Sequence, residues 1–141
     1  MKFLSTKYLF LFITFTFVMT TSVFSQKQIS EEEVNTQKIF IDANKEKILG
    51  NYENAVYLFK EVLKRDNKNH AALYELARIY DVQKKNDKAL HSIKEALSIT
   101  PENVWYEMFL ADIHDKMGKP KEAAKVYEKL VEQDSENTYY F

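Results

Sequence analysis

The chain has 141 residues, a length that suits one domain. Its formal net charge of −1 gives no general attraction to nucleic acid or to an anionic membrane. It has no cysteine, which excludes disulfides, thiolate zinc sites, thiol nucleophiles and lipidated cysteines, and its two glycines and two prolines favour helices over a multi-stranded β fold.

Residues 1–25 resemble a secretory signal peptide. Lys2 and Lys7 give a basic start, an apolar stretch follows at 8–19, and Ser25 fits the end of a cleavage site. The apolar stretch is too short for a comfortable membrane span, which needs about 20 residues. We therefore expect export to the periplasm or the cell exterior of a Gram-negative bacterium, without stable membrane insertion once residues 1–25 are removed. An uncleaved anchor is the alternative.

A polar lead-in at 26–35 precedes a region that is predicted to be all-α. Ser30 with Glu33 three residues later is a capping-box pattern, so the first helix is expected to begin near Glu31. Apolar residues then recur at helical spacing. They predict helices at about 31–48, 53–65, 70–83, 87–99, 102–117 and 120–133.

The helix connections carry recognisable turn residues. Gly50 and Gly118 stand at the turns after the first and fifth helices, and Lys84 stands at the corresponding place between them. Because lysine lacks the conformational freedom of glycine, we expect either that Asn86 takes a left-handed conformation or that Asp87 caps the next helix.

A repeat period of thirty-four positions relates three stretches of the chain. Alanines recur in two columns at this period, namely Ala43, Ala77 and Ala111 (77−43, 111−77) and Ala55, Ala89 and Ala123 (89−55, 123−89). Larger apolar residues follow the same period, for example Phe59, Ile93 and Tyr127. A fixed period of this length indicates stacked helix pairs. The alanines suit this arrangement because small facing side chains let two helices approach to about 8–10 Å.

The central stretch resembles the tetratricopeptide repeat (TPR) family, whose pattern is W-x2-L-G-x2-Y, then A-x3-F, then A, then P. The matching residues are Leu73, Leu76, Ala77, Tyr80, Ala89, Ile93, Ala96 and Pro101. The resemblance implies an α-solenoid of three stacked helix–turn–helix units, at 36–69, 70–103 and 104–137, after the signal segment. Glu107 stands where the family has a large apolar residue, so its packing role is expected to pass to Trp105 or Phe109.

The two ends of the predicted array differ. The first helix has Asp42, Lys45 and Glu46 at places that are apolar in the central unit, and such a polar face suits an end repeat. Residues 138–141 begin a fourth period and are rich in aromatic side chains. We therefore expect the chain to be the amino-terminal part of a longer repeat protein, with a natural tail as the alternative.

The sequence predicts no catalytic, metal or cofactor site. His70, His91 and His114 are far apart in the chain (91−70, 114−91) and form no i, i+4 pair for a metal, and His114 is expected to pack in the column of Tyr80. There is no nucleophile elbow and no glycine-rich phosphate loop. Acidic and basic residues alternate, which suits solvated helix faces better than a nucleic-acid surface.

By the resemblance, the first helix of each unit lines a concave groove that binds peptides. The expected groove residues are Phe40, Asn44, Lys47, Tyr74, Arg78, Asp81, Trp105, Met108, Asp112 and Asp115. They include the Tyr, Trp, Met and Arg types that dominate interfaces. The alternative is that Phe40, Tyr74 and Trp105 simply pack between units.

Some family members clamp the carboxyl end of a chaperone with Lys and Arg placed around Asn. Asn44 matches this clamp, but the other clamp places hold Phe40, Glu75, Trp105 and Phe109. The sequence therefore favours a non-enzymatic scaffold that binds a peptide or helix of another envelope protein by other contacts. The alternatives are a spacer or regulatory module of a longer envelope protein, and a glycan-binding surface protein in which Trp105, Tyr74 and Tyr106 stack on sugars.

Overall fold

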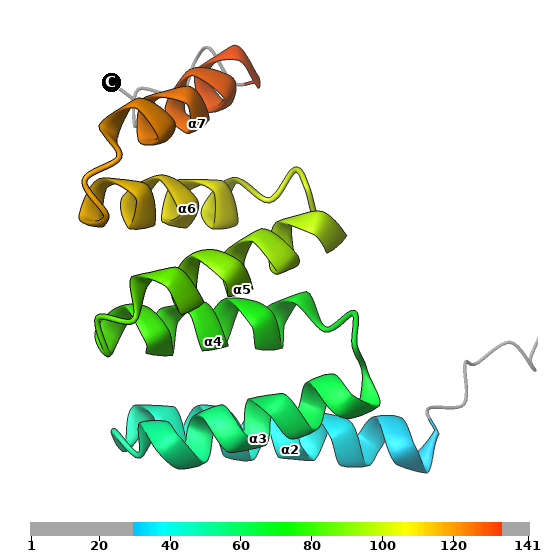
Figure 1. Ribbon diagram of the computed structural model, residues 1–141. Helices are drawn as coiled ribbons and strands as arrows, with labels where there is room; N and C mark the ends of the chain where they lie inside the picture. Colours follow the sequence, from blue (N-terminus) through cyan, green and yellow to red (C-terminus); the bar gives the residue numbers. More distant parts are fainter. Residues whose placement is uncertain (1–29, 134–141) are drawn as a thin grey trace, which may run out of the picture. The chain divides into compact units, whose positions relative to one another are not determined.

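The computed structural model describes residues 30–133, so the predicted signal peptide and the predicted start of a fourth unit lie outside the described residues (Figure 1). Within this range the chain is helical and has no strand. The helices are α2 (Glu31–Ile48), α3 (Tyr52–Arg65), α4 (His70–Val82), α5 (Asn86–Ile99), α6 (Val104–Lys116) and α7 (Pro120–Gln133). The all-α prediction is confirmed, and each helix lies within two residues of its expected bounds.

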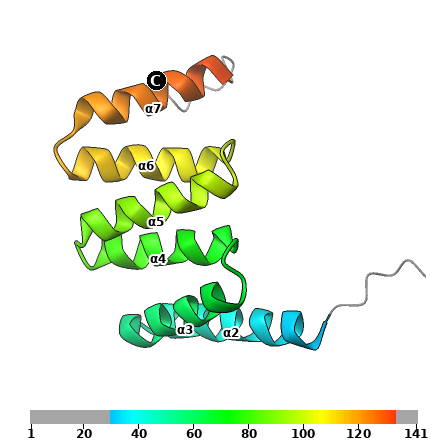
Figure 2. The same ribbon diagram turned by 45° about the vertical axis from the view of Figure 1, so that its right-hand side comes forward.

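From α3 to α7 each helix packs against the next one, and α2 meets α3 through the rings of Phe40 and Phe59 (Figures 1 and 2). Side chains of both alanine columns are buried at the seams, with Ala43, Ala55, Ala77 and Ala89 completely inaccessible to solvent. Larger side chains such as Phe59 fill the space beside these seams. The repeat period therefore places small residues where backbones approach and large ones where space remains.

Asparagine residues cap the amino-terminal ends of α4 and α6. The side chain of Asn69 accepts a hydrogen bond from the backbone N–H of Ala72 at 3.0 Å, and that of Asn103 accepts from Tyr106 at 3.2 Å. Each cap satisfies one of the backbone donors that a helix start leaves free, which stabilises the helix by about 1 kcal/mol. The two caps lie one period apart (103−69), so the helix starts repeat in step with the core.

The turns at the ends of α2, α4 and α6 share one geometry. Gly50, Lys84 and Gly118 are all left-handed, with φ of 78°, 59° and 70°. In each turn the N–H of the left-handed residue bonds the carbonyl three residues earlier, and the next N–H bonds the carbonyl five residues earlier, at 2.8–3.1 Å. The expectation for Asn86 or Asp87 was wrong, because Lys84 itself takes the strained conformation and Asn86 is already the first residue of α5.

The first turn of α6 departs from the expected packing. Glu107 is only 3% exposed although it stands in the apolar column of Leu73, and Lys129 on α7 pairs with one of its carboxylate oxygens. Trp105 does not replace it in the core, because its side chain is 72% exposed. Phe109 does pack against the core, so one of the two expected substitutes is correct.

Candidate protein-binding surface

The ten residues predicted to line a groove lie on α2, α4 and α6, the first helices of the three pairs. Neighbouring first helices touch through side chains, between Lys47 and Glu75 and between Tyr74 and Tyr106. We call the surface formed by these side chains the first-helix face. Some of these side chains already form ion pairs, hydrogen bonds or ring contacts within the protein. The side chains that remain exposed are the ones able to bind a partner.

The contact between α2 and α4 occupies Lys47, one of the two basic residues predicted for this face. The Lys47 ammonium lies 2.5 Å from a carboxylate oxygen of Glu75 and 3.1 Å from the Asn44 side-chain oxygen, and the Lys47 and Glu75 side chains are 18% and 16% exposed. The Asn44 amide donates to the Phe40 carbonyl at 3.0 Å. The polar groups of Lys47 and Asn44 are therefore already hydrogen-bonded to neighbouring residues, and the charge of Lys47 is balanced by Glu75 in the absence of a ligand.

An aromatic cluster joins α4 to α6. The rings of Tyr74 and Tyr106 stack with centroids 4.6 Å apart, and Phe109 meets Tyr74 edge-on at 5.6 Å. The hydroxyl of Tyr106 lies 2.9 Å from Nδ1 of His70, and burial raises the pKa of this phenol, with smaller contributions from Tyr74 and Glu75. Because Tyr106 is only 7% exposed, its ring is not available to stack on a sugar, which corrects that expectation.

A second ionic contact on this face joins α4 to α6 and was not predicted from the sequence. The Lys116 ammonium lies 2.9 Å from Asp81 and 2.6 Å from Asp112. Burial lowers the pKa of this lysine, but the hydrogen bonds that it donates to Asp112 and Asp81 outweigh the effect of burial, so the pKa is raised overall. Asp81 and Asp112 are therefore engaged with Lys116 rather than free to receive a basic ligand. The distance along the chain between Lys116 and Asp81 (116−81) lies outside the local spacings that sequence patterns report.

The remaining members of the first-helix face are open to solvent to different degrees. Trp105 is the most exposed large apolar residue of α6, at 72%. The Arg78 side chain is 52% exposed, and its guanidinium lies 5.8 Å from the centre of the Tyr74 ring. Met108 is half-buried and Asp115 is exposed. Phe40 instead packs edge-on against Phe59 at 5.5 Å, so it belongs to the α2–α3 seam.

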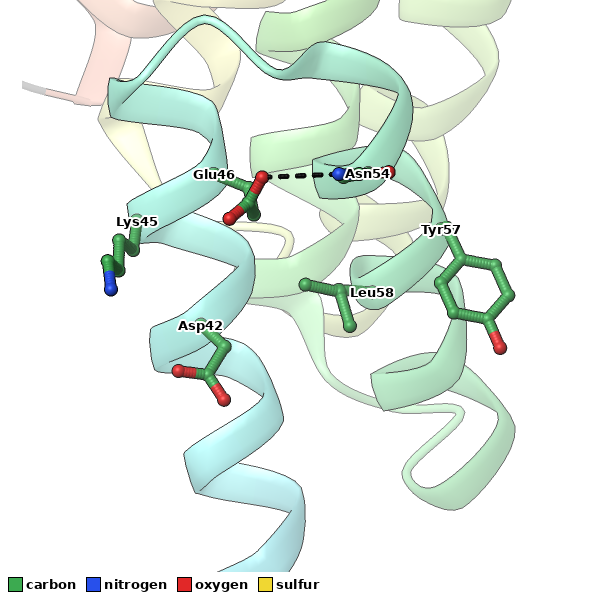
Figure 3. Close-up of a pocket in the computed structure, with 6 residues that line it drawn as sticks. All are labelled: Asp42, Lys45, Glu46, Asn54, Tyr57 and Leu58. Carbon is green, nitrogen blue, oxygen red and sulfur yellow. Dashed lines mark hydrogen bonds between the residues drawn. The ribbon is translucent and has the colours of Figure 1, made fainter.

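Two clefts on the described part of the chain include none of the ten predicted groove residues. One of about 290 Å³ is formed by Asp42, Lys45 and Glu46 of α2 with Asn54, Tyr57 and Leu58 of α3 (Figure 3). Asn54 donates to Glu46 across it at 3.4 Å. Another, of about 450 Å³, lies between α3 and α5 and has Leu73, Leu76 and Tyr80 in its wall. Neither brings together the residues of a recognisable catalytic group.

The described residues offer neither a metal site nor a membrane span. Within residues 30–133, no three His, Asp or Glu side chains are grouped so as to hold a metal ion. Over the same residues, the helices include none with the length and apolar character needed to cross a membrane. His114, 8% exposed, is buried in the column of Tyr80 as expected, and its Nδ1 has no hydrogen-bond partner among the described residues.

Antiparallel helix pairs stacked on alanine seams define an α-solenoid. The chain matches the Tetratricopeptide repeat family over residues 48–91 and 83–141. This match covers well over half of the sequence. The chain therefore belongs to the tetratricopeptide repeat family.

A curated relative agrees with this assignment. The TPR repeat-containing protein MJ1428 of Methanocaldococcus jannaschii is 31% identical over 107 residues, which cover 76% of this chain and 19% of that protein. The chain thus spans about a fifth of the length of this relative.

Solved structures share the fold at low sequence identity. The crystal structure of MamA protein has a TM-score of 0.67 and 19% identity, over 71% of this chain and 55% of that one. The first TPR of Spaghetti (RPAP3) bound to HSP90 peptide SRMEEVD has a TM-score of 0.66 and 20% identity, over 74% of this chain and 83% of that one. Identities of this size show the fold alone.

Proposed function

We propose that this protein is a non-enzymatic scaffold of three TPR units that binds a peptide or a helix of a partner protein on its first-helix face. Membership of the family supports this function, as does the fold neighbour that holds a peptide. The single observation that carries the proposal is the exposure of Trp105 at 72%, on the same helix as Tyr106 and Phe109 of the partly buried Tyr74–Tyr106–Phe109 cluster. A rigid aromatic platform with one free indole is typical of an interface anchor.

The charges of this face select among peptide ligands. Lys47, Lys116, Asp81 and Asp112 are paired within the protein, so a ligand gains little from them. Arg78 is an accessible cation of the same face, because its side chain is 52% exposed and its guanidinium contacts, among the described residues, are a 3.9 Å approach to Glu75 and the Tyr74 ring at 5.8 Å. The preferred ligand is therefore an extended segment with an apolar side chain for Trp105 and a carboxylate for Arg78, rather than a carboxyl terminus held by Lys47.

The chain offers a direct optical test, because Trp105 is its one tryptophan. Peptides selected by display on the purified protein should shift the emission of Trp105 to the blue as the indole leaves water. Trp105→Ala and Arg78→Ala should each weaken the same peptides about 10-fold or more, as expected for an interface anchor. Tyr57→Ala is the matched control, since Tyr57 is a 62% exposed aromatic residue on α3. Equal binding by Trp105→Ala would contradict the proposal.

The cellular place of this function is a separate part of the proposal. We infer export to the periplasm or cell exterior of a Gram-negative bacterium from the signal-like character of residues 1–25. Mass spectrometry of the protein recovered from cells should find an amino terminus at or near Gln26. A retained Met1 would contradict export by cleavage and leave the scaffold function to be judged by the fluorescence test.

A second candidate is a spacer or regulatory module within a longer repeat protein. The chain spans only 19% of the length of its curated relative, and this observation supports the second candidate. In that case the first-helix face contacts another segment of the same protein instead of a separate partner. The sequencing of the complete transcript, followed by crosslinking from position 105, distinguishes a contact within one chain from a contact between two.

A further inference from the structure

The outer side of α2 carries a stripe of exposed aliphatic residues that the peptide-binding proposal leaves unused. Val34, Ile41 and Ile48 are 56%, 61% and 80% exposed. They follow each other at steps of seven residues, so at about 100° per residue they lie within about 20° of one line along the helix. Three large aliphatic side chains aligned in this way give one side of α2 an apolar line along its length.

The repeat explains which side of the protein this stripe occupies. Ile41 lies one period before Glu75 (75−41) and two periods before Phe109 (109−41), and both of these contact the preceding first helix, through Lys47 and Tyr74 respectively. The stripe therefore lies on the side of α2 that, in α4 and α6, contacts the first helix of the preceding unit. We call this side the receiving face. Within residues 30–133, α2 is the first helix of the stack and no predecessor covers this face.

Ile48 occupies an equivalent receiving position. It lies two periods before Lys116 (116−48), which reaches back from α6 to Asp81 of α4. Two positions of the stripe thus correspond to residues that cross to the preceding helix. The contacts of α4 with α2, and of α6 with α4, show that a helix can pack against this side.

Lysines replace the buried members of this receiving face. Lys38 lies one period before Ala72 (72−38) and Lys45 one period before Ile79 (79−45), and Ala72 and Ile79 are 0% and 1% exposed. On α2 both lysines are exposed. Another TPR unit stacked here in the usual way would bury two unpaired ammonium groups, which is strongly unfavourable. The face is therefore closed to a further unit of the same kind but suited to a helix that brings carboxylates.

The charge around the stripe has one sign. On the helical projection, the charged residues of α2 within about 60° of Ile41 are Lys38 and Lys45, and the nearest carboxylates, Glu31 and Glu33, lie about 80° away. The flank opposite the lysines carries Gln37 and Asn44, which are uncharged. Aliphatic side chains in line, with cations along one edge, complement an amphipathic helix that has apolar residues every turn and acidic residues beside them.

We propose that α2 docks an acidic amphipathic helix of a partner protein along Val34, Ile41 and Ile48, with Lys38 and Lys45 pairing its carboxylates. The stripe extends from position 34 to position 48, which corresponds to about 21 Å of helix, so a partner segment of about four turns covers it. This surface is separate from Trp105, and its occupant is distinct from the peptide of the first-helix face.

The test uses the protein as recovered from cells and two synthetic helical peptides labelled with fluorescein. The acidic probe carries Leu along one face and Glu beside it, and the basic probe is the same peptide with Lys in place of each Glu. Fluorescence anisotropy should show the acidic probe binding about 10-fold or more tightly at low salt, with the difference shrinking as salt screens the charges. Equal affinities for the two probes would overturn the proposal.

Charge reversal provides the decisive variant. Lys38→Glu with Lys45→Glu should reverse the preference, so that the basic probe binds more tightly. Lys121→Glu with Lys125→Glu makes the same change of net charge at exposed positions of α7, and it should leave the preference as it was. An unchanged preference in the α2 variant, with helicity by circular dichroism also unchanged, would overturn the proposal.

Apolar and crosslinking variants identify the occupant. Ile41→Ser should weaken both probes about 10-fold, because each loses the burial of an aliphatic side chain, whereas Tyr57→Ala, at an exposed aromatic residue of α3, should leave both affinities intact. A photoreactive amino acid in place of Ile41 should crosslink to the acidic probe. Crosslinking to a second copy, or to residues 1–29 of the same chain, while the acidic probe is present would overturn the assignment of the partner.

Discussion

Replacing Glu107 by leucine should stabilise the protein. Glu107 is 3% exposed, and its second carboxylate oxygen has no hydrogen-bond partner among the described residues. An unsatisfied buried polar atom costs about 1–3 kcal/mol. The pair with Lys129 returns only part of this, because the Lys129 side chain is half exposed and such pairs contribute about 1 kcal/mol or less. Leucine also matches Leu73, which fills the same place one unit earlier.

The expected gain for Glu107→Leu is about 1–2 kcal/mol in the free energy of unfolding. For a folded region of this size, that corresponds to a rise in Tm of about 4–10 °C. The assay is urea unfolding at pH 7 followed by far-ultraviolet circular dichroism, with the slope of the transition compared between variants. Thermal unfolding in the same buffer provides the Tm.

A double-mutant cycle with Lys129 tests the reason for this gain. Lys129→Met alone should lower stability by about 1–2 kcal/mol, because it leaves the Glu107 carboxylate buried without a partner. In the Glu107→Leu background the same change should alter stability by less than about 0.5 kcal/mol. Equal losses in both backgrounds, or a loss of stability in Glu107→Leu, would refute the reasoning.

Three further predictions concern the turns, the buried histidine and the helix seam. Lys84→Gly should stabilise by about 0.5–1 kcal/mol in urea unfolding, because it removes the strain of a left-handed lysine. The Tm should fall as the pH drops below about 6.5, and His114→Tyr should abolish this fall, measured as Tm against pH. Ala77→Leu should lower stability by about 1–3 kcal/mol by overpacking the α4–α5 seam, measured in urea.

Matched variants accompany these three predictions. Gly118→Ala should destabilise by about 1 kcal/mol, and since no atom lies within 4 Å of the added Cβ, the backbone conformation is the cause. His91→Gln should keep the pH dependence, because His91 is 75% exposed. Ala124→Leu lies at an exposed position and should change stability by less than about 0.5 kcal/mol. A matched variant that behaves like its partner would contradict the corresponding explanation.

The sign of the pH effect follows from the direction of the His114 shift. Burial lowers the pKa of this imidazole below 6.5, with Lys94 acting in the same direction. The unfolded chain therefore takes up a proton at a higher pH than the folded chain does. Stability is at its full value above about pH 6.5 and falls as the pH drops through that value toward the folded pKa.

The helical architecture was predictable because the same sequence pattern occurs in three successive stretches of the chain. Ala77 alone says little, but Ala43 and Ala111 at the same period fix the seam, and all three are buried. The helix bounds followed from apolar spacing and from turn residues such as Gly50 and Gly118. A periodic core is readable because each column must meet the same packing demand in every unit.

The departures from the repeat were harder to predict because they depend on contacts between units. The sequence placed Lys84 at a glycine position, yet the hydrogen bonds of that turn, rather than residue preference, decide that Lys84 itself becomes left-handed. The sequence showed Glu107 in an apolar column but not that Lys129 would reach it. The sequence could not decide whether Trp105 or Phe109 takes over the packing role at this column. In the structure Phe109 packs against the core and Trp105 is exposed to solvent.

The candidate surface was only partly readable for the same reason. Residue types and spacing select the ten first-helix positions, but not which of them are already paired. Lys47 with Glu75, and Lys116 with Asp81, are too far apart in the chain (75−47, 116−81) for any local pattern to report them. These ionic contacts leave Trp105, Arg78 and Asp115 as the exposed members.

Hydrogen exchange with and without a selected peptide locates the ligand on the folded chain and so decides whether the first-helix face is the binding surface. We expect slower exchange in α4 (His70–Val82) and α6 (Val104–Lys116), the helices that carry Arg78 and Trp105, and unchanged exchange in α3 and α5. Slower exchange confined to α3 (Tyr52–Arg65) and α5 (Asn86–Ile99) would place the ligand on the second helices and contradict the proposed role of the first-helix face.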